Sequence, residues 1–166
     1  AYMNLVLFKL ILIAHNISDF VIQSDDTVKL KENFKLKDFF LHILIVFILT
    51  FCLLIFYDFK TAVICSLLVV VTHLIIDFFK VCIARKIDKR FDLLLFLLDQ
   101  ILHIIFIYFI SINFDFSRVM YFNFSDKILL NIVVYLYIVF AGRFIVEKSL
   151  NGFKPVKRQQ TELEIK

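Results

Sequence analysis

Residues 61–82 read TAVICSLLVVVTHLIIDFFKVC. This stretch is apolar for long enough to cross the hydrocarbon core of a bilayer as a helix, which takes roughly 20 residues. Its ionisable side chains, His73, Asp77 and Lys80, all fall in its second half. Because a histidine and an aspartate are costly to expose to lipid, we expect them to face other parts of the protein.

The pattern of residues 61–82 recurs along the chain, since four further segments are equally apolar. Of the 166 residues, 61% are hydrophobic and 20% charged, whereas soluble domains average roughly 45–50% and about 25%. The two glycines and one proline supply too few turn residues for a many-stranded membrane barrel. We therefore predict an all-α, polytopic integral membrane protein, with a transmembrane helical domain at 1–147 and a polar cytoplasmic tail or linker at 148–166. About five transmembrane helices would form the bundle, at about 4–23, 39–57, 61–82, 91–112 and 127–146.

Lysine and arginine are distributed unevenly between the two ends of these segments. Fifteen fall in segments 24–38 and 80–90 and in the region from Arg143 onward, against three on the opposite side. Because basic residues are retained in the cytoplasm, the bias predicts an N-terminus outside and a C-terminus inside. Sidedness also accounts for the net charge of +4 better than a nucleic-acid surface does. Lys9, inside the first segment, is expected to extend its ammonium group outward.

Two of the connections are long and contain apolar residues. Segment 24–38 alternates lysines with apolar residues, and segment 113–126 is rich in phenylalanine. Both patterns predict a segment that lies on the membrane surface.

All four histidines lie within the predicted helices, and three of them have an aspartate four residues away. Residues four apart share one face of a helix. With 11 aspartates in the chain, three such pairs among four histidines would arise by chance on the order of 1% of the time. Counted at roughly 1.5 Å per residue, these groups fall at similar depth in the cytoplasmic half of the bilayer. They are His15, Asp19, His42, His73, Asp77, Asp99 and His103.

Histidine and aspartate together form a ligand set for a divalent cation. Imidazole suits zinc or iron, and carboxylate suits manganese. Asp19 is the candidate catalytic base, and Lys80 would hold an anionic group. The alternative is a buried hydrogen-bonded network that holds no ion, or a proton relay. The expected ligands of one or two ions are His15, His42, His73, Asp77, Asp99 and His103.

At these residues the chain resembles a family of bacterial inner-membrane proteins catalogued only as a domain of unknown function. Its motifs are, in order, His-x3-Asp-Phe-x2-Gln, a lone His, His-x3-Asp-x2-Lys and Asp-Gln-x2-His. The resemblance covers about residues 4–150 and implies a multi-pass protein of the bacterial inner membrane. Residues 72–77 are also similar, more distantly, to membrane-bound metal-dependent hydrolases, which implies hydrolysis. The motifs correspond here to His15, Asp19, Phe20 and Gln23, then His42, then His73, Asp77 and Lys80, then Asp99, Gln100 and His103.

Three functions are compatible with these residues. The first is metal-dependent hydrolysis of an amphiphilic phosphate or lipid at the cytoplasmic face, and the second is a carrier for protons or metal ions. The carrier is disfavoured because both glycines and the proline lie beyond residue 141, where they cannot break a helix at the membrane midplane. The third is a non-catalytic subunit that docks a soluble cytoplasmic partner. Membrane lipid is the expected surrounding, a homo-oligomer is left open, and no nucleic acid is expected.

Overall fold

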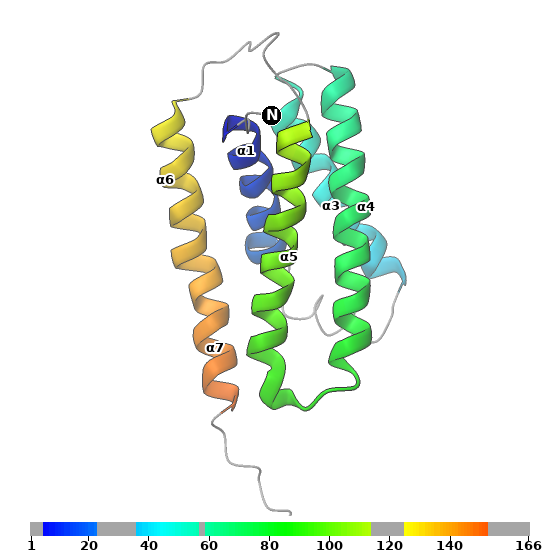
Figure 1. Ribbon diagram of the computed structural model, residues 1–166, viewed down its shortest axis with the longest axis vertical. Helices are drawn as coiled ribbons and strands as arrows, with labels where there is room; N and C mark the ends of the chain where they lie inside the picture. Colours follow the sequence, from blue (N-terminus) through cyan, green and yellow to red (C-terminus); the bar gives the residue numbers. More distant parts are fainter. Residues whose placement is uncertain (1–4, 23–35, 57–58, 114–124, 153–166) are drawn as a thin grey trace, which may run out of the picture.

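The computed structural model describes residues 5–22, 36–56, 59–113 and 125–152. Every regular element in these ranges is helical, and the long helices run side by side as a bundle (Figure 1). The predicted all-α class is therefore confirmed for this part of the chain. The elements are α1 (Leu5–Asn16), the π-helical segment η1 (Ile17–Ile22), α3 (Leu36–Leu54), α4 (Phe59–Ala84), the 3₁₀ turn η2 (Lys89–Phe91), α5 (Asp92–Asn113), α6 (Asp126–Leu136), the π-helical segment η3 (Tyr137–Ala141) and α7 (Gly142–Gly152).

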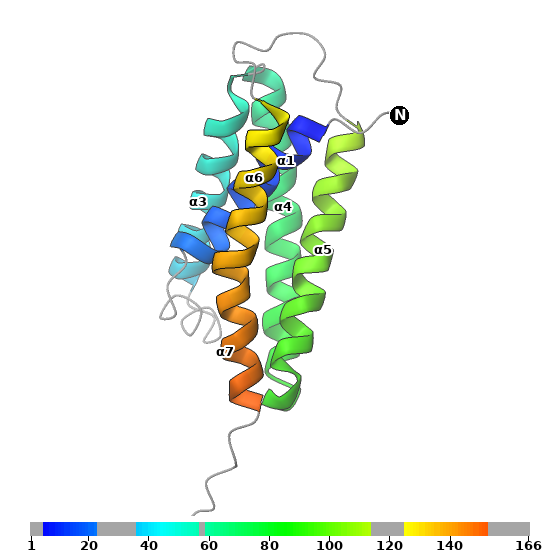
Figure 2. The same cartoon turned by 90° about the vertical axis from the view of Figure 1, so that its left-hand side faces the viewer.

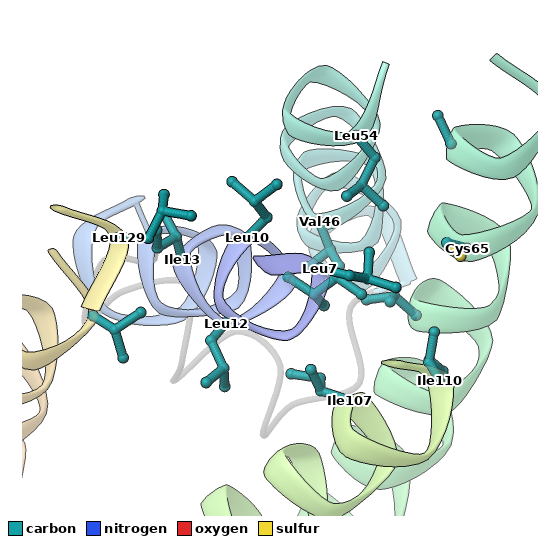
Figure 3. Packing of buried hydrophobic residues seen from close by; sticks show 14 of the residues in the cluster. Leu7, Leu10, Leu12, Ile13, Val46, Leu54, Cys65, Ile107, Ile110 and Leu129 are labelled. Carbon is teal, nitrogen blue, oxygen red and sulfur yellow. The ribbon is translucent and has the colours of Figure 1, made fainter. Parts of the chain in front are cut away.

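The first helix is the central one. α1 packs against α3, α5 and α6 and is tilted relative to its neighbours (Figure 2). Figure 3 shows Leu7, Leu10 and Leu12 pointing away from the α1 axis in different directions. The buried apolar cluster around them also takes Val46 from α3 and Ile107 from α5. A helix with apolar residues on every side belongs in the interior of a bundle, and the polar residues of α1, Lys9 and His15 among them, are buried there as well.

Polar side chains lie inside the bundle, and apolar side chains cover its outside. His73 is 1% exposed and Asp99 2%, whereas Phe40 and Ile138 are each 70% exposed. A soluble protein has the reverse preference for charged residues, so the surface of this bundle indicates a membrane protein. The helices long and apolar enough to cross a membrane are Leu5–Ile22, Phe59–Ala84, Asp92–Asn113 and Asp126–Leu150, while the apolar part of α3, Phe39–Leu54, is shorter.

Three helices extend beyond their predicted limits by two residues or more, among them α4, which was expected at 61–82. α3 begins at Leu36, three residues before the expected start of the second helix, and α7 continues to Gly152 rather than ending near residue 146. Hydropathy marks only the apolar part of a helix, whereas lysine and glutamate are good helix formers that let the backbone hydrogen bonds continue. The predicted surface segments at 24–38 and 113–126 lie outside the described residues except at their ends. Gln23 and residues 153–166 also lie outside them.

Lys9 of α1 forms an ion pair with Asp126 at the start of α6. The lysine side chain is 9% exposed and the aspartate side chain 58%. The sequence predicted that the Lys9 ammonium group extends outward. In the structure it contacts the carboxylate of Asp126 in the first turn of α6. A carboxylate there also interacts favourably with the positive end of the helix dipole. The pair therefore ties α1 to α6.

We expect Asp126→Asn to lower the free energy of unfolding by about 1 kcal/mol, because it leaves the largely buried Lys9 charge without its partner. For a protein of this size the change corresponds to roughly 2–4 °C in melting temperature, measured by circular dichroism in detergent. The double variant Lys9→Met, Asp126→Asn should recover most of the loss. An equal loss in the double variant would contradict this account of the pair.

Candidate metal centre

Five helical elements contribute to one buried cluster of histidines and aspartates, which we call the His/Asp centre. The first motif lies where α1 passes into η1, the lone histidine on α3, and the other two motifs on α4 and α5. None of these side chains is more than 9% exposed. The structure thus brings together all seven groups that share the predicted depth. They are His15, Asp19, His42, His73, Asp77, Asp99 and His103.

Four of these side chains meet at one point, which we call the α3–α4 set. The Nε2 atoms of His42 and His73 are 2.9 Å apart. Asp19 Oδ1 is 3.4 Å from the first nitrogen and 3.5 Å from the second. Asp77 Oδ2 is 3.7 Å from each of them. Two imidazole nitrogens and two carboxylate oxygens are therefore brought together from two helices, α3 and α4, and from η1.

Asp19 reaches this point from the π-helical turn η1. In that turn the backbone repeat is i to i+5, so each side chain is displaced around the axis relative to a regular α-helix. The Ser18 hydroxyl oxygen is 2.8 Å from the His15 carbonyl oxygen and 3.1 Å from Asp19 Oδ1, so its single proton is donated to one of these acceptors or shared between them. η1 and Ser18 together fix the direction of the Asp19 carboxylate. π-Helical turns inside helices are found frequently at functional sites.

The opposite side of the centre is formed by α5 together with Lys80. Lys80 Nζ donates to Asp99 Oδ2 at 2.6 Å, and Gln100 Nε2 donates to the same oxygen at 3.1 Å. His103 Nε2 is 3.6 Å from Asp99 Oδ1 and 3.8 Å from Asp77 Oδ1. Because the Lys80 side chain is 33% exposed, this is the part of the centre that connects to the surface.

The tautomer of His15 is set by Gln100. The Gln100 amide nitrogen is turned toward the Asp99 carboxylate, which only accepts, so its carbonyl oxygen is turned toward the histidine. His15 Nε2 donates to that oxygen at 3.3 Å. In the neutral ring, Nδ1 then carries the lone pair. It has no hydrogen-bond partner among the described residues and lies 3.8 Å from Asp19 Oδ2.

The chain was compared with known protein families, and the matching family covers all residues of the His/Asp centre. A family model described as a protein of unknown function (DUF3307) matches residues 6–139. The chain belongs to this DUF3307 family. The predicted resemblance to a domain of unknown function is thus confirmed. No curated protein and no solved structure matches the chain. No named relative therefore supports the similarity to metal-dependent hydrolases.

Three motifs of this DUF3307 chain are the pairs predicted from their spacing. His15 and Asp19, His73 and Asp77, and Asp99 and His103 are in contact within their own helices, at 3.8, 3.7 and 3.6 Å. Groups of three ligand atoms lie within 4.8 Å of one another in three combinations. They are His15 with His73 and His103, Asp19 with His42 and His73, and Asp77 with Asp99 and His103.

Some members of the site could not be found from the histidine pattern. Ser18 carries no signal beyond its place beside Asp19. Lys148 lies on α7, which carries none of the motifs. Its Nζ is nevertheless 6.0 Å from the centre of the Phe96 ring, and Lys80 Nζ is 5.9 Å from the same ring centre. Lys80 itself, predicted to hold an anionic group, is paired with Asp99 in the structure.

Proposed function

We propose that the chain binds a divalent metal ion in the α3–α4 set and uses the centre to hydrolyse a phosphate ester of an amphiphile. The observation that carries this proposal is the arrangement of His42 Nε2, His73 Nε2, Asp19 Oδ1 and Asp77 Oδ2. The five separations that involve an imidazole nitrogen run from 2.9 to 3.7 Å. A tetrahedral ion about 2.0–2.1 Å from each ligand separates the ligand atoms by about 3.3–3.4 Å. Zinc, manganese and iron are the candidate ions.

The membrane arrangement is part of the proposal. Five spans would include α3, whose 19 residues make about 28 Å of helix, close to the roughly 30 Å of a hydrocarbon core. The basic connection between α4 and α5 and the end of α7 would face the cytoplasm. The His/Asp centre then lies nearer the cytoplasmic face. The family resemblance favours a bacterial inner membrane.

An anionic, partly apolar substrate is favoured by the surroundings of Lys80. Lys80 and Lys148 both lie over the Phe96 ring, which packs with Phe20 and Phe144. Two ammonium groups beside an aromatic surface at the edge of a membrane bundle suit a phosphate headgroup attached to a lipid or prenyl chain. Lys80 would then contact both the substrate and Asp99.

The proposed hydrolysis uses water as the nucleophile. A divalent ion held in the centre would act as a Lewis acid there, and with a coordination position left for water it would lower the pKa of that water to about 7. The water oxygen forms a bond to phosphorus as the P–O bond to the leaving alcohol breaks, one water proton is taken up by the protein, and the protein passes that proton on to the leaving oxygen. The free lone pair of His15 Nδ1 makes it the proposed proton acceptor, with Asp19 stabilising the imidazolium. This exchanges the roles expected from the sequence, where His15 was a ligand and Asp19 the base.

The first test is elemental analysis of detergent-purified protein after removal of loosely bound ions. We expect at least one equivalent of zinc, manganese or iron in the wild type and its loss in His73→Ala. Ser66→Ala is the matched control, because Ser66 is a fully buried polar residue of the same helix outside the centre. Stoichiometric metal should be accompanied by hydrolysis of lipid phosphates. A wild type that binds no metal would overturn the proposal.

A proton carrier is the second candidate, favoured by the packing of the four imidazoles. The ring centres of His42 and His73, His73 and His103, and His103 and His15 are 5.0, 4.4 and 4.5 Å apart. The chain of rings ends, however, at the apolar cluster around Leu7, Leu10 and Val46. Proton flux into proteoliposomes that is abolished by His15→Ala would favour the carrier over the hydrolase.

A further inference from the structure

Asp77 lies between two groups of ligand atoms and turns one oxygen to each. Its Oδ2 is 3.7 Å from His42 Nε2 and from His73 Nε2. Its Oδ1 is 3.8 Å from His103 Nε2. A carboxylate that presents its two oxygens to two separate groups of ligand atoms has the arrangement of a ligand shared by two ions. Pairs of ions in hydrolytic enzymes lie roughly 3.5–4 Å apart.

The second group, which we call the α5 set, contains ligand atoms that face each other as ion pairs without forming a hydrogen bond. His103 Nε2 and Asp99 Oδ1 are 3.6 Å apart, and both are buried without a hydrogen-bond partner among the described residues. The residues themselves are 3% and 2% exposed. Leaving a buried polar atom unsatisfied costs about 1–3 kcal/mol, and more for a charged group. A cation between Asp77, Asp99 and His103 would satisfy both atoms.

We propose that the His/Asp centre holds two divalent ions bridged by Asp77. One ion is bound by the α3–α4 set, and the other by His103 Nε2, Asp99 Oδ1 and Asp77 Oδ1. This inference rests on the proposed function and extends it by a second site. The atoms Asp99 uses for Lys80 and for the ion are different, because Lys80 and Gln100 both bind Oδ2.

The two sites differ in the number of protein ligands. The α3–α4 set supplies four, whereas the α5 set supplies three and leaves a position open. Catalytic ions keep such a position for water or substrate. The α5 set is also the one beside Lys80, whose side chain is 33% exposed. The open site therefore faces the direction from which a phosphate would enter, and a phosphate ester is the class of substrate that a bridged pair of ions activates.

The test uses the full chain in detergent, stripped with a chelator and reloaded with Mn²⁺. Metal is counted by elemental analysis, and the ions are examined by electron paramagnetic resonance. We expect two equivalents of Mn²⁺ in the wild type with the spectrum of a magnetically coupled pair. In His103→Ala we expect one equivalent with the spectrum of an isolated ion, and Asp99→Asn should behave in the same way if His103→Ala does not fold.

The outcomes separate the bridged pair from the proposed function. One equivalent in the wild type with an isolated-ion spectrum would overturn the pair and leave a single metal site intact. Two equivalents without magnetic coupling would overturn the bridging role of Asp77. No bound metal would overturn both the pair and the proposed function. Loss of both ions in His103→Ala, with the fold retained, would contradict the independent α3–α4 set.

Discussion

In the Asp77→Asn variant we expect metal binding by the His/Asp centre to be weakened by at least about 100-fold. Substituting a residue that only orients a ligand already costs about 10–100-fold in metal affinity, and Asp77 is proposed to be a ligand itself. Asparagine keeps the shape of the side chain but is neutral and offers one oxygen instead of two. Because the two oxygens of Asp77 face different imidazoles, the single substitution is expected to affect both ions. Competition with a chromogenic chelator measures the change.

Two comparisons make this result specific. Ser66→Ala alters a fully buried polar residue of the same helix and should leave the affinity unchanged. Asp126→Asn removes a carboxylate outside the centre and should also keep the metal while lowering stability slightly. Full metal affinity in Asp77→Asn would exclude Asp77 as a ligand and would leave the centre as a hydrogen-bonded network.

Metal is also expected to raise the stability of the chain by a large amount. Without an ion, three aspartates and four histidines share one buried volume, and some of their ligand atoms have no partner. A ligand present at 100 times its dissociation constant stabilises the folded state by about 2.7 kcal/mol. For a protein of this size this corresponds to roughly 5–10 °C in melting temperature. Thermal unfolding in detergent, with Mn²⁺ or Zn²⁺ added to chelator-treated protein, measures the shift.

Asp77→Asn serves as the control for this experiment as well. Its melting temperature should not respond to the same metal concentration, and the Ser66→Ala variant should respond as the wild type does. An equal rise in all three proteins would mean that the ions act on the detergent or on the protein surface. The absence of any rise in the wild type would contradict a metal centre that is coupled to folding.

The sequence predicted much of the site because the apolar segments and the spacing of the polar residues within them can both be read from it. Apolar segments near 20 residues predict helices, and the four-residue spacing of His73 and Asp77 predicts a shared face. Counting residues from the helix ends then predicts that the pairs of different helices meet. The structure has these helices, and it has the pairs in contact with one another. Depth and spacing are properties of single helices, so a sequence can express them.

The way in which the helices pack against one another is much harder to predict from the sequence. The sequence gives no indication that α1 is surrounded by the others, since every predicted helix is apolar on most of its surface. The π-helical turn that carries Asp19 replaces a regular turn without any proline or glycine to mark it. The partner of Lys80 depends on the rotation of α4 relative to α5, which side-chain packing decides. These contacts determine which oxygen of each carboxylate is available for a ligand.

The distribution of the centre over α1, α3, α4 and α5 has a consequence for how the protein is made. A ribosome delivers the helices in order, and His15 precedes its hydrogen-bond partner Gln100 by 85 positions. The first helix must therefore enter its environment with His15 and Asp19 lacking the groups that will later surround them. At the rates of synthesis typical of cells, about 5–20 residues per second, this interval lasts several seconds or more. During this time the nascent chain depends on the insertion machinery, or on water at the membrane surface, to accommodate two polar side chains that the finished protein encloses.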